Sequence, residues 1–79
     1  MDNEIPLRLT EEEEIILDWD GRTGKRGSFE TSLMDTINKA DGINLAKLRT
    51  IYPVHVRAHE RWAHEEGWID MVRAKAGKI

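Results

Sequence analysis

The sequence TEEEEIILDWD, residues 10–20, decides how the chain begins to fold. Thr10 followed three residues later by Glu13 is typical of a capping box, in which each side chain accepts the other residue's backbone N–H. The acidic residues of the first turn lie where the helix dipole favours negative charge. We therefore expect a helix to begin directly after Thr10.

This first helix is predicted to cover residues 11 to about 19 and to end at Gly21. The rotation of about 100° per residue places Ile15, Ile16 and Trp19 on one side of it. The sequence is compatible with two arrangements of this helix, packed on the rest of the chain or projecting from it.

The same stretch makes the charge of the chain uneven. Residues 1–20 hold eight of the fifteen acidic side chains and one of the twelve basic ones, Arg8. These 20 residues carry a net charge of −7 and the other 59 carry +4, which gives the overall −3. An acidic end on a basic body suits either docking on a charged partner or folding of the chain on itself.

Apolar periodicity predicts further short helices. The second has Ser28 as its N-cap and stops at Asp41 and Gly42. Its apolar stripe consists of Phe29, Leu33, Met34, Ile37 and Ala40. The third helix carries Ile43, Leu45, Leu48 and Ile51.

The fourth predicted helix begins at Pro53, which suits a first helical position and biases Tyr52 out of the helix. It ends at Gly67, and its buried stripe is expected to consist of Val54, Ala58 and Trp62. A short final helix carries Trp68, Ile69, Met71 and Val72. The predicted fold is all-α, a small bundle of four to five short helices in one domain, residues 1–79, with residues 1–9 as a flexible or extended tail.

The small size of the chain limits its core and its compartment. A domain this short buries only about 60% of its unfolded surface, so a homodimer would help it, with the fourth helix or residues 68–72 as the seam. The chain has no cysteine for disulfides. Its acidic N-terminus is unlike a signal peptide, and no apolar run approaches the roughly 20 residues of a membrane span. We expect a cytoplasmic protein without membrane contact.

His55 and His59 are four residues apart, a spacing at which two imidazoles can bind one zinc ion. His64 follows five residues after His59, so these side chains point about 140° apart and the metalloprotease pattern is not met. A third and fourth ligand are missing from the sequence around them. We therefore predict no metal and no cofactor, and interpret His55 and His59 as boundary residues packing against aromatic rings.

A basic glycine-rich segment, GRTGKRG, joins the first two predicted helices at residues 21–27. Backbone N–H groups ahead of a helix N-terminus would suit phosphate, but the glycine spacing is not that of a Walker loop and no strand precedes it. The segment is either a flexible connector or a contact for phosphate, nucleic acid or an acidic protein through Arg22, Lys25 and Arg26.

Basic residues also support one functional hypothesis, a DNA-binding regulator of helix-turn-helix type. It would use Arg57 and Arg61 of the fourth helix together with Lys47 and the basic segment. The chain as a whole is acidic, whereas DNA-binding domains are usually basic. This hypothesis is therefore the alternative.

The favoured hypothesis is binding to another protein. Two of the three tryptophans are expected in the core, whereas Trp68, directly after Gly67, is expected to be partly exposed, as interface anchors are. No nucleophile–base pair or paired carboxylates stand at a recognisable site, so no enzymatic activity is predicted. The residues predicted to bind the partner are Glu11, Glu12, Glu13, Glu14, Asp18, Trp19, Asp20 and Trp68.

Residues 28–68 carry aromatic, Ala-Asp, Asn-Leu, aromatic-Pro and Gly-aromatic positions at fixed offsets. These positions are Phe29, Leu33, Ile37, Ala40, Asp41, Asn44, Leu45, Leu48, Tyr52, Pro53, Val56, Arg61, Trp62, Gly67 and Trp68. In this pattern, which covers 41 of the 79 residues, the chain resembles small helical proteins of unknown function from bacteriophages and prophages.

The resemblance implies an origin in a mobile element and brings no catalytic residues with it. In size and charge the chain is also similar to small acidic phage inhibitors of host machinery, which include anti-CRISPR proteins. The expected function is that of an accessory protein that blocks a host protein or complex through its acidic helix.

Overall fold

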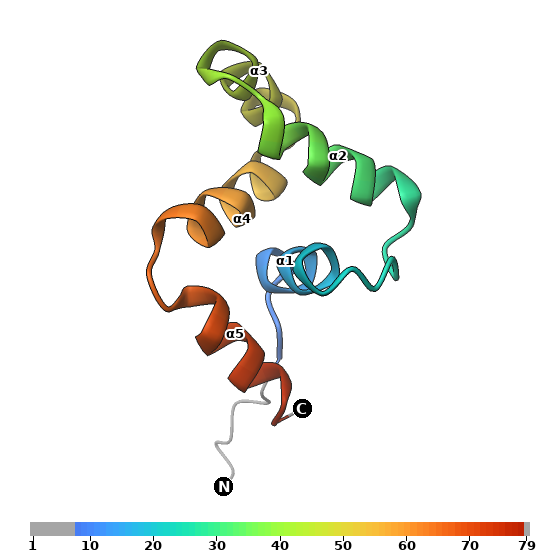
Figure 1. Ribbon diagram of the computed structural model, residues 1–79, viewed down its shortest axis with the longest axis vertical. Coiled ribbons are helices and arrows are strands. Elements are labelled where there is room, and N and C mark those ends of the chain that lie inside the picture. Colours follow the sequence, from blue (N-terminus) through green and yellow to red (C-terminus); the bar gives the residue numbers. More distant parts are fainter. Residues whose placement is uncertain (1–7, 79) are drawn as a thin grey trace, which may run out of the picture.

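The computed structural model describes residues 8–78, and in that range the chain forms α-helices and no strands. The helices are α1 (Glu11–Gly21), α2 (Ser28–Lys39), α3 (Gly42–Ile51), α4 (Pro53–His64) and α5 (Trp68–Ala76) (Figure 1). The predicted all-α bundle of short helices is confirmed. The predicted tail falls mostly on residues 1–7, outside the described part.

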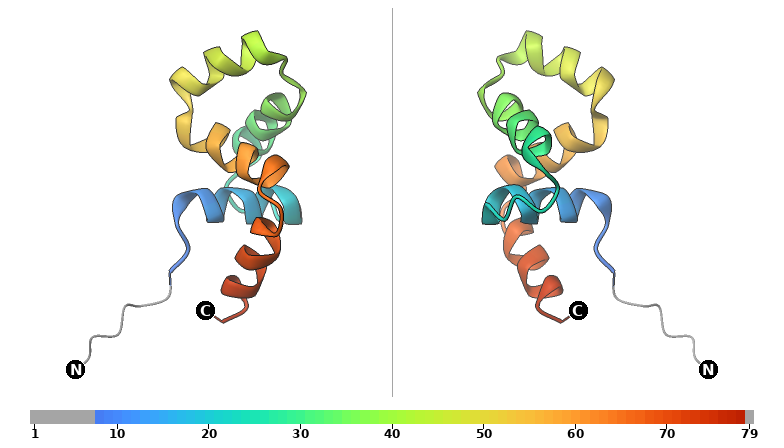
Figure 2. Two further views of the ribbon diagram at one scale, coloured as in Figure 1. Left: turned by 90° about the vertical axis from the view of Figure 1, so that its left-hand side faces the viewer. Right: turned by 90° about the vertical axis from the view of Figure 1, so that its right-hand side faces the viewer.

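Helix α4 is the central element, because it packs against each of the other four helices. Helix α1 packs against α2, α4 and α5. In both views of Figure 2, α3 lies at one end of the molecule and α5 at the other, with α1 crossing between them. Within residues 8–78, none of the helices has the length and apolar character needed to cross a membrane.

The core is built from four of the five helices. Its most completely buried side chains include Ile15 and Ile16 of α1, which are 1% and 0% exposed. Full burial of one such side chain stabilises the fold by about 1.5–3 kcal/mol. The other buried apolar residues are Leu33, Met34, Ile37, Val56, Ala58, Trp68 and Val72. Helix α3 contributes none of them.

Two of the predicted apolar stripes differ from the observed ones. Phe29 was expected in the stripe of α2 but is 61% exposed, because it stands in the first turn, with the Tyr52 ring 6.1 Å away between centroids. In α4, Val56 is fully buried while Val54 and Trp62 are half-buried. A helix surrounded by four others buries more than one side, so a single stripe is a poor description of α4.

Three helix boundaries also differ from the predictions. Gly27, with φ 97°, is the N-cap of α2, and Ser28 is already its first residue and makes no side-chain cap. Helix α2 ends at Lys39, before Asp41. The Asp41 carboxylate instead accepts the Asn44 N–H at 2.8 Å and caps α3. Helix α4 ends at His64, before Gly67, which turns the chain with φ 83° into α5.

At the end of α1 the left-handed position falls on Arg22, with φ 54°, rather than on Gly21. The Arg22 N–H donates to Trp19 O at 3.2 Å and closes the helix. Left-handed backbone costs a residue with a Cβ about 1 kcal/mol, and glycine avoids that cost.

We therefore expect Arg22→Gly to stabilise the protein by about 0.5–1 kcal/mol in urea unfolding. The matched control is Gly24→Ala, at φ 67°, where an added Cβ meets nothing within 4 Å and only the backbone conformation resists. This control should destabilise by about 1 kcal/mol. The opposite order of the two variants would contradict the observed turn.

Candidate functional site

The acidic residues of α1 face basic residues of the same chain. Glu12 accepts hydrogen bonds from Arg57 Nε at 3.0 Å and from Arg61 Nη1 at 3.2 Å, both on α4. Asp20, at the other end of α1, is paired with Arg73 of α5. The helix is thus packed on the body by its charges as well as by its isoleucines.

Glu13 combines the predicted capping box with a buried ion pair. Thr10 N–H donates to Glu13 Oε1 at 2.7 Å, and Glu13 N–H donates to Thr10 Oγ1 at 3.2 Å, so the capping box is confirmed. Lys75 Nζ reaches the same carboxylate at 2.8 Å. Burial favours the neutral acid, but the bonds from Lys75 and Thr10 outweigh it and hold the pKa of Glu13 below its ordinary value.

Glu11 and Glu14 are the two acids of this helix that stay open to solvent, with side chains 60% and 53% exposed. Each lies within ion-pair distance of Arg26, at 3.8 and 3.6 Å. Exposed pairs of this kind contribute little to stability. Of the four consecutive glutamates, these two are the ones an approaching partner would meet.

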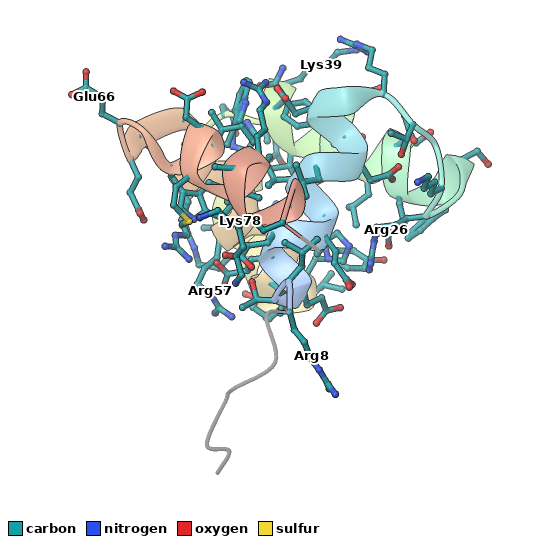
Figure 3. All side chains as sticks on the ribbon, turned by 90° about the horizontal axis from the view of Figure 1, so that it is seen from below. Arg8, Arg26, Lys39, Arg57, Glu66 and Lys78 are labelled. Atoms are coloured by element: carbon teal, nitrogen blue, oxygen red, sulfur yellow. The ribbon has the colours of Figure 1, made fainter. Side chains whose placement is uncertain are left out.

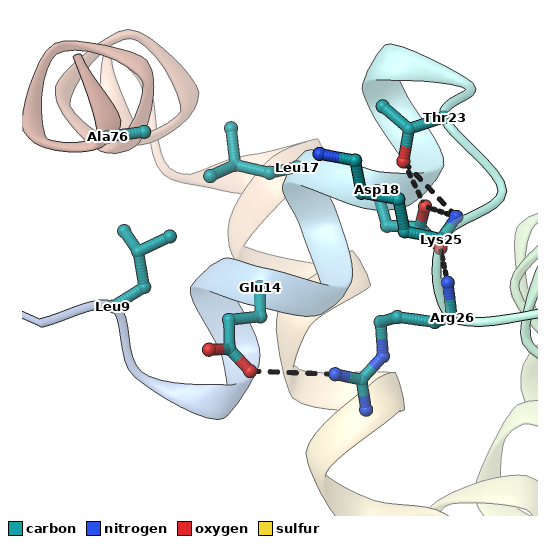
Figure 4. Close-up of a pocket in the computed structure, with 8 residues that line it drawn as sticks. All are labelled: Leu9, Glu14, Leu17, Asp18, Thr23, Lys25, Arg26 and Ala76. Atoms are coloured by element: carbon teal, nitrogen blue, oxygen red, sulfur yellow. Dashed lines mark hydrogen bonds and ion pairs between the residues drawn. The ribbon is translucent and has the colours of Figure 1, made fainter. Parts of the chain in front are cut away.

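The glycine-rich segment closes around a carboxylate of the chain itself (Figure 4). Asp18, which is 7% exposed, accepts the Thr23 hydroxyl, the Lys25 N–H at 2.8 Å and the Arg26 N–H at 3.4 Å. Burial raises the pKa of Asp18, but these hydrogen bonds more than compensate and leave it lowered. The backbone donors proposed for phosphate are therefore occupied, and the segment is anchored rather than a free connector.

The five basic residues predicted to contact nucleic acid do not form one open surface. Arg26 donates to Glu30 at 2.9 Å, and Arg57 and Arg61 are held by Glu12. Arg61 also lies over the Trp68 ring, 4.6 Å from its centroid. Arg61 is bound to Glu65 as well. Of these five residues, only Arg22 and Lys25 form no ion pair within the described chain.

His55 and His59 point to different partners. His55 Nε2 donates to Glu30 at 2.8 Å, whereas His59 Nε2 donates to Asn38 Oδ1 at 3.0 Å. Burial, and secondarily the charge of His64, lowers the pKa of His59. Within residues 8–78, no three His, Asp or Glu side chains are grouped so that they could hold a metal ion. The two histidines are half-buried boundary residues.

The tryptophans are arranged differently from the prediction. Trp68 was expected to be partly exposed but is only 4% exposed, because Gly67 turns the chain and α5 starts with its first side chain directed into the core. Trp19 and Trp62 are half-buried and meet edge to face, with centroids 4.9 Å apart. Val72 is fully buried as well, so Trp68 and Val72 are unavailable as the seam of a homodimer.

The most exposed apolar side chains lie on α3, the helix predicted from Ile43, Leu45, Leu48 and Ile51. Ile43 and Ile51 are 73% and 67% exposed, and none of the ten residues of α3 is buried. The helix holds to the core through Leu45 and Leu48. At about 100° per residue, Ile43, Lys47 and Ile51 fall on one side of α3, within about 80° of one another, and Ile51 borders Leu48. We name this side the α3 face.

A groove lies beside the α3 face, between α2 and α3. It has a volume of about 390 Å³ and is lined by Thr36, Lys39, Ala40, Asn44, Lys47 and Leu48. We name it the lysine groove. The signal for this site was present in the sequence, since the four apolar residues of α3 do not fall on a single side of a helix.

Comparison of the chain with models of protein families, with curated protein sequences and with solved structures finds no match.

The Lys75–Glu13 pair predicts a specific pH dependence. Because the pKa of Glu13 is lowered in the folded protein, its contribution to stability is present above its ordinary value of 4.5 and is lost as the pH falls below it. Glu13→Gln keeps a capping-box side chain but removes the charge, and should destabilise by about 1–2 kcal/mol at pH 7. The difference from the native protein should shrink towards pH 3 in urea unfolding. Glu11→Gln is the control and should change stability by less than about 0.5 kcal/mol.

Asp18 predicts a second, local effect. In Asp18→Asn the amide NH₂ would confront the three donors that now converge on the carboxylate, and we expect a loss of about 2 kcal/mol. Amide exchange of Lys25 and Arg26 should become faster in NMR spectra. Asp70→Asn, at an 80% exposed side chain, is the matched control. Unchanged exchange in the Asp18 variant would show that the carboxylate does not hold the segment.

Proposed function

We propose that this protein is a non-enzymatic binding protein that contacts another protein through the α3 face. The observation that carries the proposal is the exposure of Ile43 and Ile51 on a helix that buries none of its residues. Large apolar side chains left in solvent on one side of a helix are typical of an interaction site. Phe29, 61% exposed, adds a further apolar side chain outside the core.

The acidic helix receives a mainly structural role in this proposal. Glu12, Glu13 and Asp20 already pair with arginines and a lysine of the chain, and Asp18 holds the basic segment. A partner that used these carboxylates would have to break those contacts first, whereas Glu11 and Glu14 remain accessible. The α3 face has no such competing contact.

The biological setting of the proposal comes from the resemblance of residues 28–68 to small phage and prophage proteins. In that setting the protein would act in the cytoplasm as an accessory protein of a mobile element. An inhibitor of a host defence complex, similar to anti-CRISPR proteins, is the form that its small size and exposed apolar helix support. The target would then be the protein that covers α3.

The alternative, a DNA-binding regulator, draws support from Arg22, Lys25 and Lys47. These side chains form no ion pair with another residue of the described range, but Arg26, Arg57 and Arg61 do. Two isoleucines on the exposed side of α3 also suit a protein surface better than a phosphate backbone. Protein binding is therefore the function that the geometry favours.

The test replaces apolar surface without changing charge. Ile43→Gln/Ile51→Gln should fold like the native protein, because both side chains lie largely in solvent and surface substitutions change stability by about 0.5 kcal/mol or less. The native protein and this double variant are each used as bait in nuclease-treated bacterial lysate. The native bait should capture one protein in stoichiometric amount, and the variant should capture at least tenfold less of it. Mass spectrometry identifies and quantifies that protein.

Met71→Gln is the matched control, because it removes an exposed apolar side chain, 47% exposed, from α5 at the other end of the molecule. It should capture as much as the native bait. Equal capture by the α3 variant and the control would refute the proposed surface. A native bait that captures DNA and protein only from lysate without nuclease would favour the regulator.

A further inference from the structure

We propose that the segment that binds the α3 face is an amphipathic helix that places an acidic side chain in the lysine groove. This inference rests on the proposed function and adds the chemistry of the partner to it. The occupant would carry apolar residues for Ile43 and Ile51 and a carboxylate for Lys39 and Lys47. It is a protein segment and not a nucleic acid or a second copy of this chain.

The distribution of positive charge indicates where a carboxylate of the partner would bind. The cations that pair with carboxylates of the described range are Arg26, Arg49, Arg57, Arg61, Arg73 and Lys75. Lys39 and Lys47 make no such pair within residues 8–78, and both line the same groove. Figure 3 shows Lys39 extending away from the ribbon. The lysine groove is therefore a place where positive charge gathers without an internal counter-charge.

Acidic residues around the groove are already engaged. Asp35, four residues before Lys39, accepts the Trp19 Nε1–H at 2.9 Å, Asp41 caps α3 by accepting the Asn44 N–H, and Glu60 is paired with Arg49. A carboxylate from outside would meet the two ammonium groups without competition from these acids. Ala40 and Leu48 supply apolar walls beside it, where water is partly displaced and a charge-assisted hydrogen bond is stronger.

The spacing of side chains along α3 indicates the pattern of the partner helix. Ile43 and Ile51 are eight residues apart, which is about 12 Å along a helix axis, with Lys47 midway. A helix laid along this face presents two apolar side chains about two turns apart and an acidic one between them. That pattern is the ordinary way in which an amphipathic helix meets a helical surface.

Charge complementarity also decides between the occupants. If two copies paired their α3 helices antiparallel about a two-fold axis, Lys47 would face Lys47, which is repulsive. Nucleic acid would satisfy the lysines but would leave both isoleucines against phosphate or sugar. An acidic and apolar protein helix satisfies all of these groups together.

The test uses two synthetic helical peptides of identical sequence except at one central position, which is Glu in one and Lys in the other. Each has two leucines, four residues before and four after that position. In ¹⁵N spectra of the native protein, the Glu peptide should shift the amide signals of residues 39–51 and bind at least tenfold more tightly than the Lys peptide. Lys39→Glu/Lys47→Glu should reverse this preference.

Lys25→Glu/Lys78→Glu is the matched control, because it changes the net charge equally at residues outside the groove, and it should keep the preference of the native protein. Equal affinities for the two peptides would overturn the inference while leaving the α3 face as a binding surface. Absence of shifts with the Glu peptide, or shifts in residues 39–51 with a DNA duplex alone, would also overturn it. The capture experiment with Ile43→Gln/Ile51→Gln reports separately on the proposed function.

Discussion

The burial of Ile15 and Ile16 is the constraint on which the rest of the structure depends. These side chains belong to a helix whose neighbouring positions are acidic, and an unpaired carboxylate brought to a protein interior is strongly destabilising. The helix can therefore dock only where positive charge meets it. Helix α4 brings arginines to Glu12, and α5 brings Lys75 to Glu13. The charge asymmetry of the chain is in this way used inside the molecule, and it fixes how three helices pack.

The features that could be predicted from the sequence are local ones. The capping box lies within four residues, Pro53 marks the start of α4 through its own backbone preference, and apolar periodicity locates all five helices. The features that could not be predicted depend on contacts across the chain. Lys75 and Glu13 are 62 residues apart, and the sequence around either residue does not predict that the two will pair. Trp68 shows the same limit, because its burial depends on the direction that Gly67 gives to α5.

The candidate site shows that the direction of a side chain matters as much as its type. The four apolar residues of α3 spread over about 200° of the helix, so Leu45 and Leu48 pack against the core while Ile43 and Ile51 stay exposed. Binding of a partner by the acidic run stays a prediction, and most of its carboxylates contact basic side chains or backbone N–H groups of the same chain. In both cases composition was informative, whereas the contacts of each side chain could be seen only in the structure.

Helix α3 is also the one described helix without a buried residue, and Leu45, Leu48 and the Arg49–Glu60 pair attach it to the other helices. A ten-residue helix is marginal by itself in water, and such a segment opens locally at a lower free energy than the whole domain. If α3 is the binding surface, as proposed, it is then also the part of the molecule that would fray first. A bound partner would order it, affinity would be reduced by the entropy of that ordering, and slower hydrogen exchange along α3 would report occupancy.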